Sequence, residues 1–179
     1  MCIRDRSKII DLQAGEQHDA EYIKLNPNHV VPTLICDEKI LVESSLILEF
    51  LEDKFPEKSA RSNIPEEIHQ MRLWMKTIDA YHIHGGSITY GIGVRNILIL
   101  KPKDELDKEI DEIPDLEKRE NRRDLIENGL EAKCVIEGLK QSKILMDKLE
   151  LGLKDREWFS GSKFGLADAS IFPYVLRWE

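Results

Sequence analysis

Two short segments of this sequence carry groups that suit the binding of a small charged ligand. The first is Glu43-Ser44, which follows a short β-favouring segment and opens an apolar helical pattern. Free backbone N–H groups and the helix dipole at such a start favour a carboxylate, and the Ser44 hydroxyl can donate to it. The Glu43 carboxylate can pair with an ammonium group. For Ser44 alone, the alternative is a simple helix N-cap.

Val31-Pro32 is the second segment, and its place at the entrance of a strand is unusual. Pro32 has no N–H to donate, although Val30, Val31 and residues 33–35 favour a strand. Such a bond is trans by default, and Pro32 alone is a plain turn proline. A cis bond would instead leave the backbone of Val31 outside the sheet, where a peptide-like ligand could add as a short antiparallel strand. Together, the two segments predict a site for a small peptide with an α-carboxylate and an α-amine.

Turn residues and apolar periodicity predict the elements that hold these segments. Asn26-Pro27 should stop a short helix, and Ser44 or Ser45 should cap a longer one. In chain order we expect a strand at residues 8–12, one or two helical turns at 20–25, strands at 33–36 and 40–42 about a turn at 37–39, and a helix from 44 to about 54.

Beyond a turn-rich linker at residues 58–64 the pattern is helical. A bend is expected at Gly85-Gly86, with the helix resuming over residues 90–100. The charge-dense residues 101–124 should form a solvated connection. Within it, Pro114 and Asp115 should begin a further helix. Two apolar stripes predict buried faces: one is Ile68, Met71, Met75, Ile78 and His82, with Trp74 and Tyr81 beside it, and the other is Leu125, Ala132, Val135, Leu139, Met146, Leu149 and Leu153.

The bulk composition excludes several classes of protein. A net charge of −8 over 179 residues argues against a general nucleic-acid binder. No apolar run approaches the roughly 20 residues of a membrane span. Cys2, Cys36 and Cys134 are scattered without metal-ligand spacing. His82 and His84 would not share a helix face, so no metal site is expected. We predict a cytoplasmic protein.

The stretch LNPNHVVPTLICDEKILVES, residues 25–44, resembles the cytosolic glutathione transferases, of bacterial or delta/theta-like type. The later segment GSKFGLADASIFPY, residues 161–174, is similar to the start of a late helix in that family. The resemblance implies an α+β unit followed by an all-α unit: a partial thioredoxin-like domain at residues 8–57 and a helical-bundle domain at 65–179. It also implies a homodimer that conjugates glutathione, its co-substrate, to small electrophiles without a metal.

Carried onto this sequence, the resemblance gives individual residues a role in glutathione binding. Val31, before Pro32, would pair through its backbone with the cysteinyl part, and Glu43 with Ser44 would hold the γ-glutamyl end. His29 would face the glycyl carboxylate, with an ordinary surface histidine as the alternative. Other classes use Lys or Gln one position later, where this chain has Val30.

The helical half receives roles from the resemblance as well. Tyr81, Tyr90 and Arg95 would lie on the helix that faces the electrophile pocket, whereas Trp74 is expected to pack in the core. Gly165 stands where the family usually has Ser or Thr, three residues before Asp168. Glycine is a tolerable cap, and Asp168 can still accept from the Gly165 N–H. Both residues are therefore expected to be structural.

The resemblance implies further parts that we do not find in this sequence. Residues 8–12 match the second strand of the thioredoxin-like domain, and only MCIRDRS stands before them. We interpret residues 1–7 as a non-native leader, and the chain as a fragment without the first strand, the first helix, the thiol-activating residue and the last helices. Cys2 and Ser7 are not expected to replace that residue, so no catalytic residue is predicted here. The alternatives are a non-catalytic binding or scaffold module of the same family and a glutathione-dependent dehalogenase or ether-cleaving enzyme.

Overall fold

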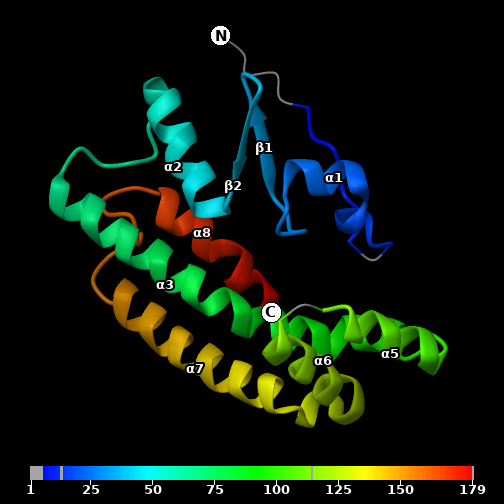
Figure 1. Cartoon of the computed structure of the whole chain (residues 1–179). Coiled ribbons are helices and arrows are strands. Elements are labelled where there is room, and N and C mark those ends of the chain that lie inside the picture. The colour runs from blue at the N-terminus through cyan, green and yellow to red at the C-terminus, as the bar shows by residue number, and fades with distance from the viewer. Residues whose placement is uncertain (1–5, 13, 114, 179) are drawn as a thin grey trace. The chain divides into compact units, whose positions relative to one another are not determined.

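The computed structural model describes residues 6–12, 14–113 and 115–178, and the chain divides into two compact units. The first unit is Met1–Ser59 and the second is Ala60–Glu179 (Figure 1). Residues 1–5 of the expected leader, which include Cys2, lie outside the described residues. Within the described part, no helix is both long and apolar enough to cross a membrane.

The first unit is built around one β-hairpin. Strand β1, Thr33–Cys36, pairs antiparallel with β2, Lys39–Val42, and the register places Thr33 opposite Val42 and Cys36 opposite Lys39. Asp37 and Glu38 form the turn with positive φ angles of 50° and 66°, which suit a tight hairpin connection. Helix α1 spans Ala20–Leu25 and helix α2 spans Ser44–Lys54, with 3₁₀ turns at Glu16–His18 and Pro56–Lys58.

The strand expected at residues 8–12 is not present. Residues 8–11 have no regular secondary structure, Leu12 lies in a turn, and Ile9 is 88% exposed. A strand needs a neighbour to accept its backbone hydrogen bonds. In the described residues the sheet contains only β1 and β2, so this segment has no ladder to join.

The second unit is all helical. Its longest helices are α3, Pro65–Thr89, and α7, Lys133–Leu153, which pack along each other, while α8, Leu166–Val175, packs against α3. In Figure 1 the green α3 lies between the orange α7 and the red α8. The remaining elements are a π-helical turn at Tyr90–Val94, α4 at Arg95–Leu98, α5 at Lys103–Asp111, α6 at Leu116–Asn128, and 3₁₀ turns at Gly129–Glu131 and Leu176–Trp178.

Helix α3 does not bend at Gly85-Gly86, as the sequence suggested; it runs on to Thr89, and the irregularity is the π-helical turn that follows. Gly85 is buried, and a Cβ there would stand 3.1 Å from the Tyr81 ring. This glycine therefore serves close packing and leaves the helix intact. On the predicted apolar face of α3, Met71, Met75 and Ile78 are buried as expected, whereas His82 is exposed.

The helix expected after Pro114-Asp115 is in fact two helices. Pro114 lies outside the described residues, but Asp115 is the N-cap of α6, and its Oδ1 accepts from the Lys118 N–H at 2.9 Å. Gly129, with a φ of 59°, ends α6, and α7 begins four residues later. The preceding charge-dense segment also contains a helix, α5, whose Leu106 and Ile110 are buried.

The second apolar stripe is buried only in part. Leu125, Ala132, Val135 and Leu149 are in the core, whereas Leu139, Met146 and Leu153 are exposed. The buried face of α7 follows a different line: Val135, Gly138, Ser142, Leu145 and Leu149. Two of these five residues are not apolar side chains, so a search for apolar spacing alone missed this face.

Candidate functional site

The two ligand-binding segments lie at the same end of the β-hairpin. Because Thr33 pairs with Val42, the residues before Thr33 and those after Val42 leave the hairpin side by side at its open end. Val31 and Pro32 precede Thr33, and Glu43 and Ser44 follow Val42. The Val31–Pro32 peptide bond is cis, the alternative to the trans default.

Two buried polar side chains hold the loop that leads to Val31. The Tyr22 hydroxyl donates to the Val30 carbonyl at 2.7 Å and lies 3.0 Å from the Thr33 hydroxyl. Asn26 is completely buried; its Nδ2 donates to the same Val30 carbonyl at 2.7 Å, and its Oδ1 accepts from the Asn28 N–H at 3.1 Å. Sequence reasoning took Asn26 only as a helix stop. The Asn26-Pro27 pair indicates a turn in the sequence. That the Asn26 side-chain amide holds the loop through hydrogen bonds is seen only in the structure.

Val31 itself is accessible. Its side chain is 42% exposed, and no backbone hydrogen bond of Val31 is present in the described part of the chain. A backbone N–H and C=O in such a position can pair with an extended peptide.

Helix α2 begins differently from the expectation. Glu43, with a φ of 68°, is the N-cap, and its carbonyl accepts from the Ile47 N–H at 2.9 Å. Ser44 is the first helical residue, so the predicted cap at Ser44 or Ser45 is wrong by one or two positions. Both Glu43 and Ser44 are exposed. No acidic residue lies in the first turn of α2, and Glu43 is the acidic residue at its N-cap.

His29 lies in the turn that Asn26 organises. Its φ is 57°, a left-handed conformation that histidine adopts more readily than most residues, and its N–H donates to the Asn26 carbonyl at 3.0 Å. The Nδ1 atoms of His29 and His18 are 3.0 Å apart. His18 was not recognised from the sequence as part of this site.

A family model covers this part of the chain. Residues 7–59 match the glutathione S-transferase N-terminal domain, and these residues span the whole hairpin, α1, α2 and the loop with His29 and Val31. The similar curated proteins and solved structures include glutathione transferases as well. These comparisons support assignment of the chain to the glutathione S-transferase family, with residues 7–59 matching its N-terminal domain.

Individual relatives extend the similarity over both units of the chain. LigF of Sphingobium sp. is 28% identical over 91% of this chain, and GstB of Escherichia coli is 26% identical over 90%. The chain spans 65% and 64% of the length of these two proteins. The crystal structure of the β-etherase LigF matches 92% of this chain and 69% of its own with a TM-score of 0.80. A glutathione transferase from Burkholderia graminis, solved with two glutathione molecules bound per subunit, has the same fold, with a TM-score of 0.64 at 21% identity over 95% of this chain and 60% of its own.

The residues predicted to face an electrophile pocket all belong to the helical unit. Tyr81 is 6% exposed, and its hydroxyl lies 2.6 Å from the Ser142 hydroxyl on α7. Tyr81 is therefore a core residue whose hydroxyl provides a hydrogen-bond partner for the buried Ser142. Its assignment to a pocket stays a prediction.

Tyr90 and Arg95 are half-buried at the end of α3 and in α4, and both contact α6. The Arg122 guanidinium stacks over the Tyr90 ring, 3.9 Å from its centroid. Arg95 Nε donates to two carbonyls near the end of α6, at 3.1 Å each. Arginine near a helix C-terminus satisfies carbonyls that have no partner within the helix. A role in electrophile binding is again a prediction for these two residues.

Gly165 and Asp168 organise the start of α8. The buried Asp168 carboxylate accepts from the backbone N–H groups of Phe159, Ser160 and Gly165 at 2.8, 3.1 and 3.0 Å. A Cβ on Gly165 would stand only 2.4 Å from the Ala60 carbonyl oxygen. Glycine is therefore the residue that this position requires, beyond being a tolerable cap.

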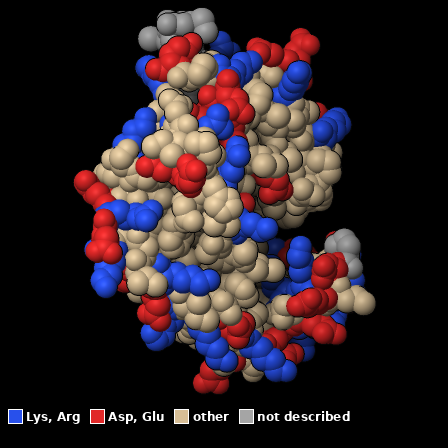
Figure 2. All heavy atoms as spheres, turned by 90° about the vertical axis from the view of Figure 1, so that its left-hand side faces the viewer, with Lys and Arg blue, Asp and Glu red and all other residues tan. Residues whose placement is uncertain are grey.

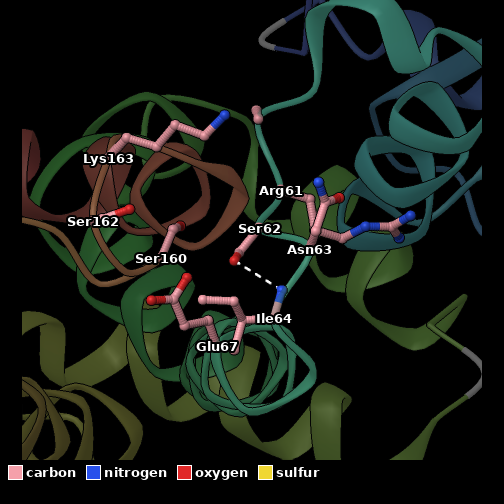
Figure 3. Close-up of a pocket in the computed structure, with 9 residues that line it drawn as sticks. Arg61, Ser62, Asn63, Ile64, Glu67, Ser160, Ser162 and Lys163 are labelled. Atoms are coloured by element: carbon pink, nitrogen blue, oxygen red, sulfur yellow. Dashed lines mark hydrogen bonds between the residues drawn. The ribbon is translucent and has the colours of Figure 1, made fainter.

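The helical unit also contains a cavity of about 300 Å³ where α3 begins (Figure 3). Ser62 Oγ accepts from the Ile64 N–H at 3.1 Å at its edge, and Glu67 reaches toward the loop that carries Ser160 and Ser162. Arg61 and Lys163 also line it, so charges of both signs meet there. The outer surface is mixed in the same way: on the face in Figure 2, acidic and basic side chains are interspersed. None of the residues predicted to bind glutathione lines this cavity.

Proposed function

We propose that this chain binds glutathione through its first unit, as part of a glutathione transferase. The observation that carries the proposal is the register of the hairpin, because it brings Val31-Pro32 and Glu43-Ser44 to one end. These two segments offer complementary groups: an accessible peptide backbone on one side and a helix start with a hydroxyl on the other. The match of residues 7–59 to the family's N-terminal domain supports the same assignment.

Each part of glutathione has a chemical partner in this arrangement. The cysteinyl N–H and C=O pair with the backbone of Val31. The γ-glutamyl carboxylate accepts from the Ser44 hydroxyl and from N–H groups in the first turn of α2, where the helix dipole favours an anion. The γ-glutamyl ammonium pairs with Glu43, and the glycyl carboxylate accepts from His29.

Ser44→Ala tests the anion site directly. The change removes one charge-assisted hydrogen bond, so the dissociation constant for glutathione should rise by about five- to 150-fold, equivalent to roughly 1–3 kcal/mol. Titration calorimetry measures this constant. Ser45→Ala, at the next helical position, is the matched control and should leave the constant unchanged. Equal affinities for Ser44→Ala and the original chain would mean that the carboxylate binds elsewhere.

The reaction of the whole enzyme is proposed as conjugation of the glutathione sulfur to a small electrophile. A second candidate is ether cleavage, which the similarity to a β-etherase favours, since that structure has a TM-score of 0.80 and the Burkholderia enzyme 0.64. In such a step the thiolate attacks the carbon attached to the ether oxygen. The C–S bond forms, the C–O bond breaks, and the alcohol or phenol leaves with a proton.

Incubation with glutathione and two probe substrates distinguishes these reactions. A chlorodinitrobenzene gives a glutathione adduct by conjugation, whereas a β-aryl ether gives a thioether and a phenol; mass spectrometry identifies each product. Glutathione binding with neither product, in the whole enzyme that includes the thiol-activating helix, would favour the non-catalytic binding module. A dehalogenase would release halide from a haloalkane, but no observation on this chain favours that reaction over the others.

A further inference from the structure

His18 precedes α1 in the sequence and His29 follows it, and their side-chain rings are in contact. Their Nδ1 atoms are 3.0 Å apart, and the ring centroids are 5.2 Å apart at an interplanar angle of 58°. The distance is that of a hydrogen bond. Such a bond exists only if one Nδ1 carries a proton and the other does not.

Both rings are attached to turns with defined backbone contacts. The His18 N–H donates to the Gly15 carbonyl at 2.8 Å, and Gly15 has a φ of 81°, which suits glycine. The His29 N–H donates to the carbonyl of the fully buried Asn26. The two histidines therefore meet because two separate turns present them to each other.

The contact decides which nitrogen of His29 is available to a ligand. Nδ1 is engaged by His18, and Nε2 has no hydrogen-bond partner within the described residues. When His29 is an imidazolium, it can donate Nδ1–H to a neutral His18 ring and Nε2–H to a carboxylate. A partner that fixes one ring nitrogen sets the orientation and the proton position of the other.

We propose that His18 is a positioning residue for glutathione, holding the His29 ring so that its Nε2–H binds the glycyl carboxylate. This inference rests on the proposed glutathione site. It assigns His18 no contact with the ligand. The preference of the chain for a free glycyl carboxylate should therefore depend on His18.

The test compares glutathione with glutathione monoethyl ester, in which the glycyl carboxylate is blocked. Titration calorimetry gives the dissociation constants for both, and the original chain should bind glutathione more tightly. His18→Ala should weaken glutathione binding by roughly two- to tenfold, the range expected for one hydrogen bond. Binding of the ester should not change, so the ratio of the two constants should approach one.

Two further variants separate positioning from local folding. His18→Asn places an amide atom close to the position of Nδ1 and should restore the preference for glutathione. His69→Ala removes an exposed histidine on α3 and should leave the ratio unchanged. The inference is overturned if His18→Ala keeps the ratio of the original chain, or if it weakens both ligands equally. If the original chain binds neither ligand, the proposed glutathione site fails as well.

Discussion

At the scale of single residues, the loop before Val31 depends on two buried polar side chains. Tyr22 and Asn26 both donate to the Val30 carbonyl, and Asn26 also fixes the next turn through Asn28. A buried amide is stabilising only when its groups are paired, and removing it leaves its partners unsatisfied. The shape of the Val31-Pro32 segment therefore rests on residues that the sequence marked only as helix and turn formers.

Asn26→Ala should destabilise the first unit by about 2–3 kcal/mol, because a fully buried side chain and its hydrogen bonds are lost. Hydrogen exchange of the amides in residues 20–36 measures the local opening, which should become faster. Asn28→Ala changes an exposed side chain in the same turn and should have little effect. Equal exchange rates in the original chain and Asn26→Ala would contradict the role given to this amide.

At the scale of elements, the start of α8 requires a residue without a side chain at Gly165. Gly165→Ala would put a Cβ 2.4 Å from the Ala60 carbonyl oxygen and 2.6 Å from the Ser160 Cβ, so the backbone would have to move. We expect a loss of about 1–3 kcal/mol in the free energy of unfolding, measured by chemical denaturation. Gly86→Ala is the matched control. It lies within α3 with nothing within 4 Å of the added Cβ, and should stabilise by about 0.5–1 kcal/mol. A Gly165→Ala chain as stable as the original would refute this packing.

The junction of α6 and α7 depends on a carboxylate. Asp124 accepts from the Lys133 N–H at 2.8 Å and from Asn128 Nδ2 at 2.7 Å. The Lys133 backbone hydrogen bond, followed by the Asn128 side chain, holds the pKa of Asp124 below its ordinary value of 3.8. A lowered folded-state pKa contributes stability above the unfolded pKa, and that contribution is lost as pH falls through the folded value.

Asp124→Asn should therefore lower stability at neutral pH, and its difference from the original chain should shrink as the pH falls below about 4. Thermal unfolding at a series of pH values measures this difference. Asp147→Asn on α7 is a suitable comparison, since its carboxylate forms an exposed ion pair with Lys143. A difference between Asp124→Asn and the original chain that stays constant down to pH 3 would show that the Asp124 charge is not involved.

At the scale of the whole molecule, local chemistry was predicted from the sequence better than long-range pairing. The hairpin and α2 were predicted because their signals, two acidic residues in a tight turn and an apolar helix face, are contained in a few residues. The strand expected at residues 8–12 is not present, because a strand is stable only beside a partner and the described sheet contains only β1 and β2. The split between α6 and α7 rests on Gly129, one glycine in a long helical pattern.

The buried face of α7 and the contact between the His18 and His29 rings could not be predicted from the sequence, for a common reason. Ser142 is in the core because Tyr81, 61 residues earlier, offers it a hydroxyl, and His18 matters because a turn brings His29 to it. Both depend on residues brought together by folding. The homodimer, by contrast, remains a prediction from family resemblance alone.

The most direct test of the central claim is a titration of glutathione into the ¹⁵N-labelled chain, followed by amide NMR shifts. We predict that the shifts concentrate at residues 29–33, apart from Pro32, which has no amide proton, and at residues 43–47, with a dissociation constant matching calorimetry. Saturable shifts at these two segments would show that glutathione binds at the open end of the hairpin. The absence of shifts, or shifts confined to the helical unit, would contradict the account.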